Sequence, residues 1–173
     1  MKFSEINQFM KAGGYEIDVP LSFLKEQLKN YEDRYGLELN PDFQRGHVWT
    51  KEQQIAWLEF FFRGGITSRV IYFNCPMFNP EYTGTVSSTM VCVDGLQRLT
   101  ALLGFLDNEI PIFGTLYEDF EDKLNDVRHS IKININNLLD KKDVIRWYIQ
   151  MNTGGTVHSK KEIERVSKLL EER

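Results

Sequence analysis

Apolar residues recur along the chain at two different spacings, and this predicts a mixture of helices and strands. Helical spacing predicts helices over 21–35, 51–63, 96–106 and 141–151. Shorter apolar or alternating runs predict strands over 15–19, 69–75, 90–93 and 131–135. Because strands and helices are interspersed from one end to the other, the pattern indicates an α/β (α+β) domain.

Turn and capping residues mark several of these boundaries. Pro20 closes the first strand, and a proline there is typical of a sheet edge. Gly36 stops the helix that follows. Thr50 and Gln53 have the spacing of a capping box, so they predict the start of the second helix.

Four stretches give weaker signals. Residues 1–14 predict a short amphipathic helix or arm, and 109–113 predicts a brief strand. The segment 76–88 is rich in Pro, Gly, Asn, Ser and Thr, which predicts a surface loop. The segment 115–129 is acidic and predicts no regular element.

The stretch from 91 to 103 is the first candidate for a functional site. Its apolar strand ends at Asp94-Gly95 and a leucine-rich helix follows, so the pattern predicts a strand, a sharp turn and a helix. We expect Asp94 to be the N-cap and Gly95 to permit the tight turn, which leaves free backbone N–H groups that attract anions. Arg98 adds a planar cation, and Gln97 adds a neutral donor and acceptor. The alternative is structural: Asp94 caps the helix and pairs with Arg98, and Gln97 faces solvent.

Two further polar stretches lie at junctions between predicted elements. Gln44 and Arg45 come shortly before Trp49. In the structural alternative to a binding role, Arg45 pairs with a nearby carboxylate and Trp49 is part of the core. Asn152 precedes Gly154 and Gly155, and the structural interpretation there is an ordinary helix end. Together the three stretches supply guanidinium groups, backbone donors and a carboxylate, which a phosphate ligand requires.

Composition limits the classes of function. The 173 residues are 42% hydrophobic and carry a net charge of −4, which favours one globular domain and excludes a broad basic surface. We therefore expect one domain over 1–173, within which 1–36 is interpreted as an N-terminal helical and strand extension. Cys75 and Cys92 are expected to be buried free thiols in a reduced compartment. No apolar run is long enough to cross a bilayer, so a cytoplasmic protein without membrane partners is expected, in the host cytoplasm if a phage encodes it.

The histidines and the clustered aromatic residues do not indicate a specific catalytic or metal-binding site. The three histidines are far apart and match no metal-ligand spacing. Trp57, Phe60, Phe61 and Phe62 form a crowded aromatic group, for which core packing is expected and an exposed partner surface is the alternative.

The three polar stretches, in this order, resemble the N-terminal domain of GmrSD-type restriction endonucleases. The resemblance rests on Pro-x-Phe-Gln-Arg-x-x-Val-Trp over 41–49, Val-Asp-Gly-Leu-Gln-Arg-Leu-Thr over 93–100 and Asn-Thr-Gly-Gly over 152–155, and it spans about 37–170. It implies a ParB/sulfiredoxin-like fold with a small mixed sheet flanked by helices. It also implies a domain that binds and often hydrolyses a nucleotide in systems that recognise or cut foreign DNA.

The resemblance also assigns roles to residues. The family's motif positions correspond to Gln44, Arg45, Asp94, Gly95, Gln97, Arg98, Asn152, Gly154 and Gly155. In the nucleoside triphosphate hypothesis, Arg45 and Arg98 hold phosphate, and Asn152 with the two glycines closes around the ligand. Asp94, Gln97 and Arg98 are the catalytic candidates, with Asp94 holding Mg²⁺ or orienting water.

Other functions stay open from the sequence. Larger relatives carry a separate His-Asn-His nuclease domain, and this sequence ends soon after its last motif, which argues against independent DNA cutting. The alternatives are a small metal-dependent DNase, a non-catalytic DNA-binding protein, or an inhibitor or decoy that binds a host defence or nuclease protein.

Overall fold

The computed structural model describes residues 1–6, 14–44, 46, 48–153 and 160–171. Within these ranges the strands are β1 (Tyr15–Pro20), β2 (Val70–Asn74), β3 (Val91–Asp94) and β4 (Ser130–Asn136). The α-helices are α1 (Leu24–Tyr35), α2 (Lys51–Phe62), α3 (Leu96–Leu106), α4 (Lys141–Thr153) and α5 (Lys160–Glu171). Short 3₁₀ turns are η1 (Phe3–Glu5), η2 (Leu21–Phe23), η3 (Pro76–Phe78) and η4 (Tyr117–Asp119).

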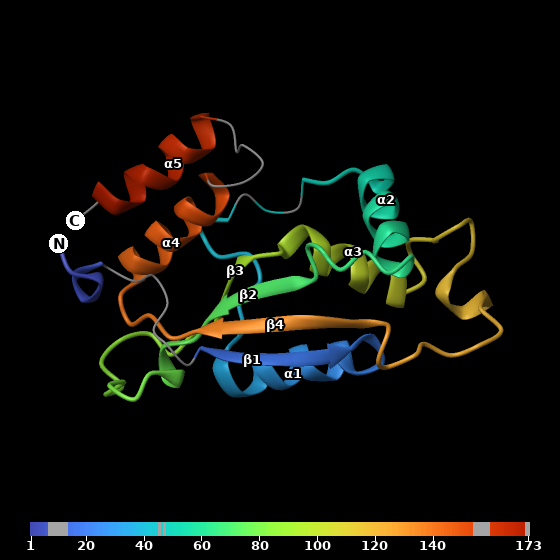
Figure 1. Cartoon of the computed structure of the whole chain (residues 1–173), viewed down its shortest axis with the longest axis horizontal. Coiled ribbons are helices and arrows are strands. Elements are labelled where there is room, and N and C mark those ends of the chain that lie inside the picture. Colours follow the sequence, from blue (N-terminus) through green and yellow to red (C-terminus); the bar gives the residue numbers. More distant parts are fainter. Residues whose placement is uncertain (7–13, 45, 47, 154–159, 172–173) are drawn as a thin grey trace.

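The four described strands form one mixed sheet in the order β1-β4-β2-β3 (Figure 1). β1 is antiparallel to β4, β4 is parallel to β2, and β2 is antiparallel to β3. The predicted α/β class, the small mixed sheet flanked by helices and the edge position of β1 are confirmed. The edge position explains why Pro20 is tolerated in a strand, because an edge strand can lack one backbone donor.

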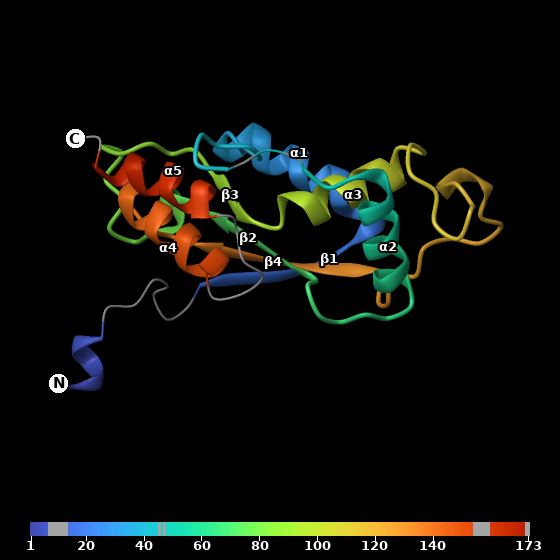
Figure 2. The same ribbon diagram turned by 90° about the horizontal axis from the view of Figure 1, so that it is seen from above.

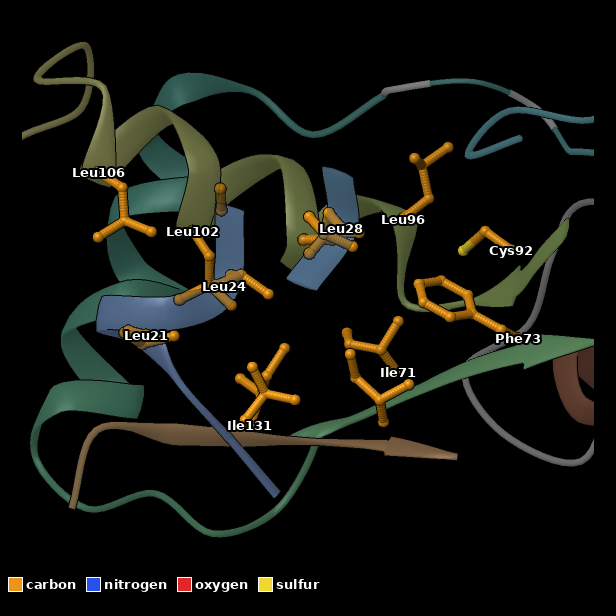
Figure 3. Packing of buried hydrophobic residues seen from close by; sticks show 14 of the residues in the cluster. Leu21, Leu24, Leu28, Ile71, Phe73, Cys92, Leu96, Leu102, Leu106 and Ile131 are labelled. Atoms are coloured by element: carbon orange, nitrogen blue, oxygen red, sulfur yellow. The ribbon is translucent and has the colours of Figure 1, made fainter. Parts of the chain in front are cut away.

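The helices lie on both faces of the sheet (Figures 1 and 2). Alternation along β2 sends Ile71 and Phe73 into the larger apolar cluster, which also contains residues of α1, α2 and α3 (Figure 3). Tyr72 points the other way and contacts Trp147 of α4, with ring centroids 6.0 Å apart. Because β1 and α1 contribute Val19 and Leu24 to the larger cluster, residues 15–35 are part of the same core as the rest of the sheet.

Several predicted boundaries are confirmed in detail. The Thr50–Gln53 capping box begins α2, with both reciprocal hydrogen bonds present. Gly36 ends α1 in the left-handed conformation at φ +58°. In the aromatic group, Phe61 is fully buried, whereas Phe60 is 46% exposed, so the group divides between core and surface.

Two further predictions were wrong. The strand expected over 109–113 is not formed, because only Ile112 has a β-bridge there, to Thr115 across a turn at 113–114. The helix or arm expected over 1–14 lies partly outside the described residues, and 3–5 form the 3₁₀ turn η1. The alternation in β4 predicts one solvated face, but only Lys132 follows it. Asn134 and Asn136 are buried on that face, because the second, smaller apolar cluster, which includes α4, lies on the side that Tyr72 faces. None of the described helices is both long and apolar enough to cross a membrane.

The two cysteines support a simple prediction. Cys75 and Cys92 are free and have no exposed surface. Burial raises the pKa of both thiols, and the nearby Asp94 raises that of Cys92 further. Because the thiolate is the reactive form, we expect neither thiol to react with a disulfide reagent in the native protein. Both should react once the chain is unfolded in denaturant, and rapid native labelling of either thiol would contradict their burial.

Candidate functional site

The turn between β3 and α3 is built around Gly95. Gly95 is the N-cap of α3 with φ +103°, a conformation that favours glycine. A Cβ on Gly95 would lie 2.6 Å from Cδ1 of Ile71 and 3.3 Å from its Cα, so β2 leaves no room for a side chain. The predicted N-cap role of Asp94 was therefore wrong, because Asp94 is the last residue of β3 and the cap position belongs to the glycine.

Arg98 is held in the first turn of α3 by two contacts. Its guanidinium forms an ion pair with Asp94 one turn earlier, and its Nη1 donates to the Ser68 carbonyl at 3.0 Å. The Arg98 side chain is 14% exposed and that of Asp94 is 32% exposed, so the pair lies at the surface with its arginine largely covered. The structural alternative expected Asp94 to pair with Arg98, and this pair is present. It holds the guanidinium near the start of α3, where backbone N–H groups have no intrahelical partners.

Gln97 connects this turn to the second polar stretch. Its Oε1 accepts hydrogen bonds from the backbone N–H groups of Val48 at 2.9 Å and Trp49 at 3.1 Å. Its Nε2 donates to the Gly46 carbonyl at 2.7 Å. Gln97 therefore does not simply face solvent, because both ends of its amide hold the segment that precedes α2 against the start of α3.

Gln44 also attaches this polar stretch to the strand that precedes the turn, β3. Its Nε2 donates to the carbonyls of Cys92 and Val93, each at 3.0 Å, so it is attached to the backbone of β3. The adjacent Phe43 is buried and packs on Tyr148 of α4, with ring centroids 5.3 Å apart. The 41–49 segment, described at residues 41–44, 46, 48 and 49, is thus attached to β3, α3 and α4.

An arginine near the end of the chain, Arg165 in α5, also holds this segment. Its guanidinium donates to the carbonyls of Asp42 at 3.1 Å, Phe43 at 3.1 Å and Gln44 at 3.3 Å. Lys141, the first residue of α4, pairs with the Asp42 carboxylate at 2.7 Å. Sequence reasoning missed Arg165, because no local motif signals an arginine that binds backbone carbonyls 121 to 123 positions away.

The third polar stretch is described only at its beginning. Asn152 donates through Nδ2 to the Tyr148 carbonyl at 2.7 Å, so its amide bonds back into α4. Because Tyr148 packs on Phe43, Asn152 belongs to the helix that supports the 41–49 segment. Arg45, Gly154 and Gly155 lie outside the described residues.

Sequence comparison identifies the family. A family model with the description "GmrSD restriction endonuclease, N-terminal domain" matches residues 24–130, which is more than half of the chain. The chain belongs to this family. The match contains the Gln44, Asp94, Gly95, Gln97 and Arg98 positions, whereas Arg165 lies beyond its end. No curated protein matches the sequence.

One solved structure resembles this GmrSD N-terminal domain. It is the crystal structure of the C-terminally truncated chromosome-partitioning protein ParB from Caulobacter crescentus complexed with CTP-γ-S. The TM-score is 0.43 and the sequence identity is 16%. The match covers 92% of this chain and 64% of that chain, so less than two thirds of the ParB chain is represented.

The described part of this GmrSD N-terminal domain has no preformed metal cluster. No group of three or more His, Cys, Asp or Glu side chains is placed there to hold a metal ion. Asp94 is a single carboxylate that is already paired with Arg98. This donor set does not suit a metal held by the protein alone, which needs several oxygen ligands.

We expect Gln97→Ala to detach the 46–49 segment from α3 in this GmrSD N-terminal domain. The substitution removes three hydrogen bonds and should lower the free energy of unfolding by about 2–3 kcal/mol, since each bond contributes roughly 1 kcal/mol. Limited proteolysis should cut faster between 44 and 50. Gln53→Ala is the control, because it removes the Gln53 side-chain bond of the capping box without affecting α3. Equal proteolysis of both variants would argue against the holding role of Gln97.

Proposed function

We propose that this domain binds a nucleoside triphosphate in a DNA restriction system, with the phosphates at the first turn of α3. The observation that carries the proposal is the contact of Gln97 with the 46–49 segment, which brings two of the three polar stretches to one place. The family description supports the restriction context. A role for this nucleotide binding in DNA restriction is part of the same proposal.

The chemistry at the start of α3 suits a phosphate. The N-terminus of α3 offers backbone N–H donors with a positive partial charge. Arg98 supplies a planar guanidinium that binds phosphate oxygens in pairs. Its contacts with Asp94 and Ser68 hold the side chain in place before a ligand arrives, which lowers the entropic cost of binding.

Asp94 has a positioning role in this proposal. Because it pairs with Arg98, it directs the guanidinium rather than forming a metal site of its own. Mg²⁺ would accompany the triphosphate, with its ligands mainly phosphate oxygens and water, and Asp94 as at most one further ligand. For hydrolysis, we assign Arg98 to neutralise charge on the phosphates and Gln97 to keep the 41–49 segment beside them.

The remaining motif residues complete the proposed ligand shell. Arg45 follows Gln44, whose side chain and carbonyl are both bonded to neighbouring elements. We assign Arg45 as a second phosphate-binding cation, and Asn152, Gly154 and Gly155 as the part that closes on the nucleotide.

Titration of the purified chain with ATP, GTP, CTP and UTP in the presence of Mg²⁺ tests the proposal. One or more nucleotides should bind and raise Tm, because a ligand at 100 times its Kd adds about 2.7 kcal/mol to stability. Inorganic triphosphate should compete, since the contacts named above are to phosphates. Released phosphate measures turnover separately from binding. Absence of binding by all four nucleotides and by triphosphate would refute the proposal.

A further inference from the structure

A cavity lies at the opposite end of α3 from Gly95. It has a volume of about 230 Å³, and its walls include Phe62, Phe105 and Tyr117. Arg98 and Phe105 are seven residues apart on one helix, so the cavity is about 10 Å further along α3 than the phosphate site. The segment 107–129 that encloses it extends from the end of the molecule away from α4 and α5 in both views (Figures 1 and 2).

The interior of this cavity is aromatic and closely arranged. Ring centroids of Phe62 and Phe105 are 5.0 Å apart, and those of Phe105 and Tyr117 are 5.3 Å apart. The His129 ring lies 5.2 Å from Phe62, and its Nδ1 accepts a hydrogen bond from the Asn125 backbone N–H at 2.9 Å. Phe120, another wall residue, is 37% exposed, so part of the aromatic surface is accessible from outside.

The loop that contributes Tyr117 and Phe120 to the cavity wall is mainly acidic, and of its charged residues Asp122 and Lys123 line the cavity itself. The segment 117–123 carries four carboxylates and one lysine, and the four carboxylate residues are exposed. These are Glu118, Asp119, Glu121 and Asp122. Such a surface repels nucleic acid and attracts a basic partner.

Size and charge together select the occupant. Pockets for small molecules usually enclose about 300–1,000 Å³, so this cavity is small for a nucleotide and suits one large side chain. We propose that the cavity is a docking site for a basic segment of a partner protein, which places one aromatic or large aliphatic side chain in the cavity against Tyr117 and Phe120 while its lysines or arginines face the acidic loop. Aromatic anchors in desolvated pockets, with charges at the rim, are typical of protein interfaces.

A synthetic lysine-rich peptide with one central tryptophan is the probe. The full chain should bind it, with NMR shifts in the backbone amides of 112–129, and binding should weaken as salt is raised. Replacing the peptide tryptophan by glycine should weaken binding about tenfold, and Phe120→Ala in the protein should do the same. Because Phe120 is partly exposed, the variant should remain folded, and an unchanged Tm checks this.

Charge-matched variants distinguish docking from general attraction. Glu121→Gln with Asp122→Asn should weaken peptide binding several-fold, whereas Glu26→Gln with Glu32→Gln on α1 makes the same change in net charge and should leave it within about twofold. Equal loss in both pairs, or equal affinity of the tryptophan and glycine peptides, would overturn the proposal. Saturating nucleotide should not displace the peptide. Displacement would mean that the peptide occupies the phosphate site and would likewise overturn the proposal.

Discussion

Gly95→Ala should destabilise the fold by about 3 kcal/mol. Two effects add: an alanine at φ +103° is strained, and its Cβ would meet Cδ1 of Ile71 at 2.6 Å and the Ile71 backbone at 3.3 Å. Ile71 is buried in the larger core, so it cannot move away without disturbing neighbouring side chains. Since 1 kcal/mol shifts Tm by about 2–4 °C in a domain of this size, thermal unfolding should begin roughly 6–12 °C earlier.

Gly64→Ala is the matched control for this prediction. Gly64 also has a positive φ of +90°, but nothing lies within 4 Å of the position that a Cβ would take there. The control therefore measures the conformational cost alone, and its loss of stability should be about 1 kcal/mol. If the two variants unfold at the same temperature, contact with Ile71 does not explain why glycine is required at 95.

Much of the secondary structure follows from local pattern. The α2 boundary is predictable because Thr50 and Gln53 satisfy each other's backbone groups, which needs nothing from the rest of the fold. The edge strand follows from Pro20 for a similar local reason. The burial of Asn134 and Asn136 was not predictable, since it depends on how α4 and the rest of the smaller cluster cover a strand whose sequence alternates like a solvated one.

The candidate site also has some features that follow from local sequence and others that depend on tertiary contacts. The turn at Gly95 and the cation at Arg98 follow from a strand, a glycine and a helix that are adjacent in sequence. The bonds from Gln97 to Gly46 and from Arg165 to Asp42 join residues far apart in sequence, and their backbone partners carry no side-chain signal. Contacts of this kind depend on tertiary packing, which is why the supporting contacts of the 41–49 segment emerge only from the structure.

The proposed phosphate site predicts a large loss of nucleotide affinity in Arg98→Ala. The substitution removes the charged donor nearest the first turn of α3 and leaves Asp94 without its partner. A charge-assisted hydrogen bond contributes about 1.5–3 kcal/mol, so loss of one should raise the Kd for the nucleotide by roughly 10- to 150-fold. Arg98→Lys should give a smaller rise, because lysine keeps the charge but loses the planar pair of donors. Equilibrium titration at one fixed salt concentration measures all three proteins.

Two further variants separate direct phosphate binding from other causes. Arg34→Ala removes the same charge from the exposed last turn of α1 and should change Kd by less than about twofold. Arg98→Ala combined with Asp94→Ala removes the carboxylate that would otherwise repel phosphate. If Arg98 contacts the ligand directly, the double variant should remain at least about tenfold weaker than the original protein. Full recovery in the double variant would instead mean that Arg98 acts only by neutralising Asp94, and the phosphate contact would have to be assigned to other groups.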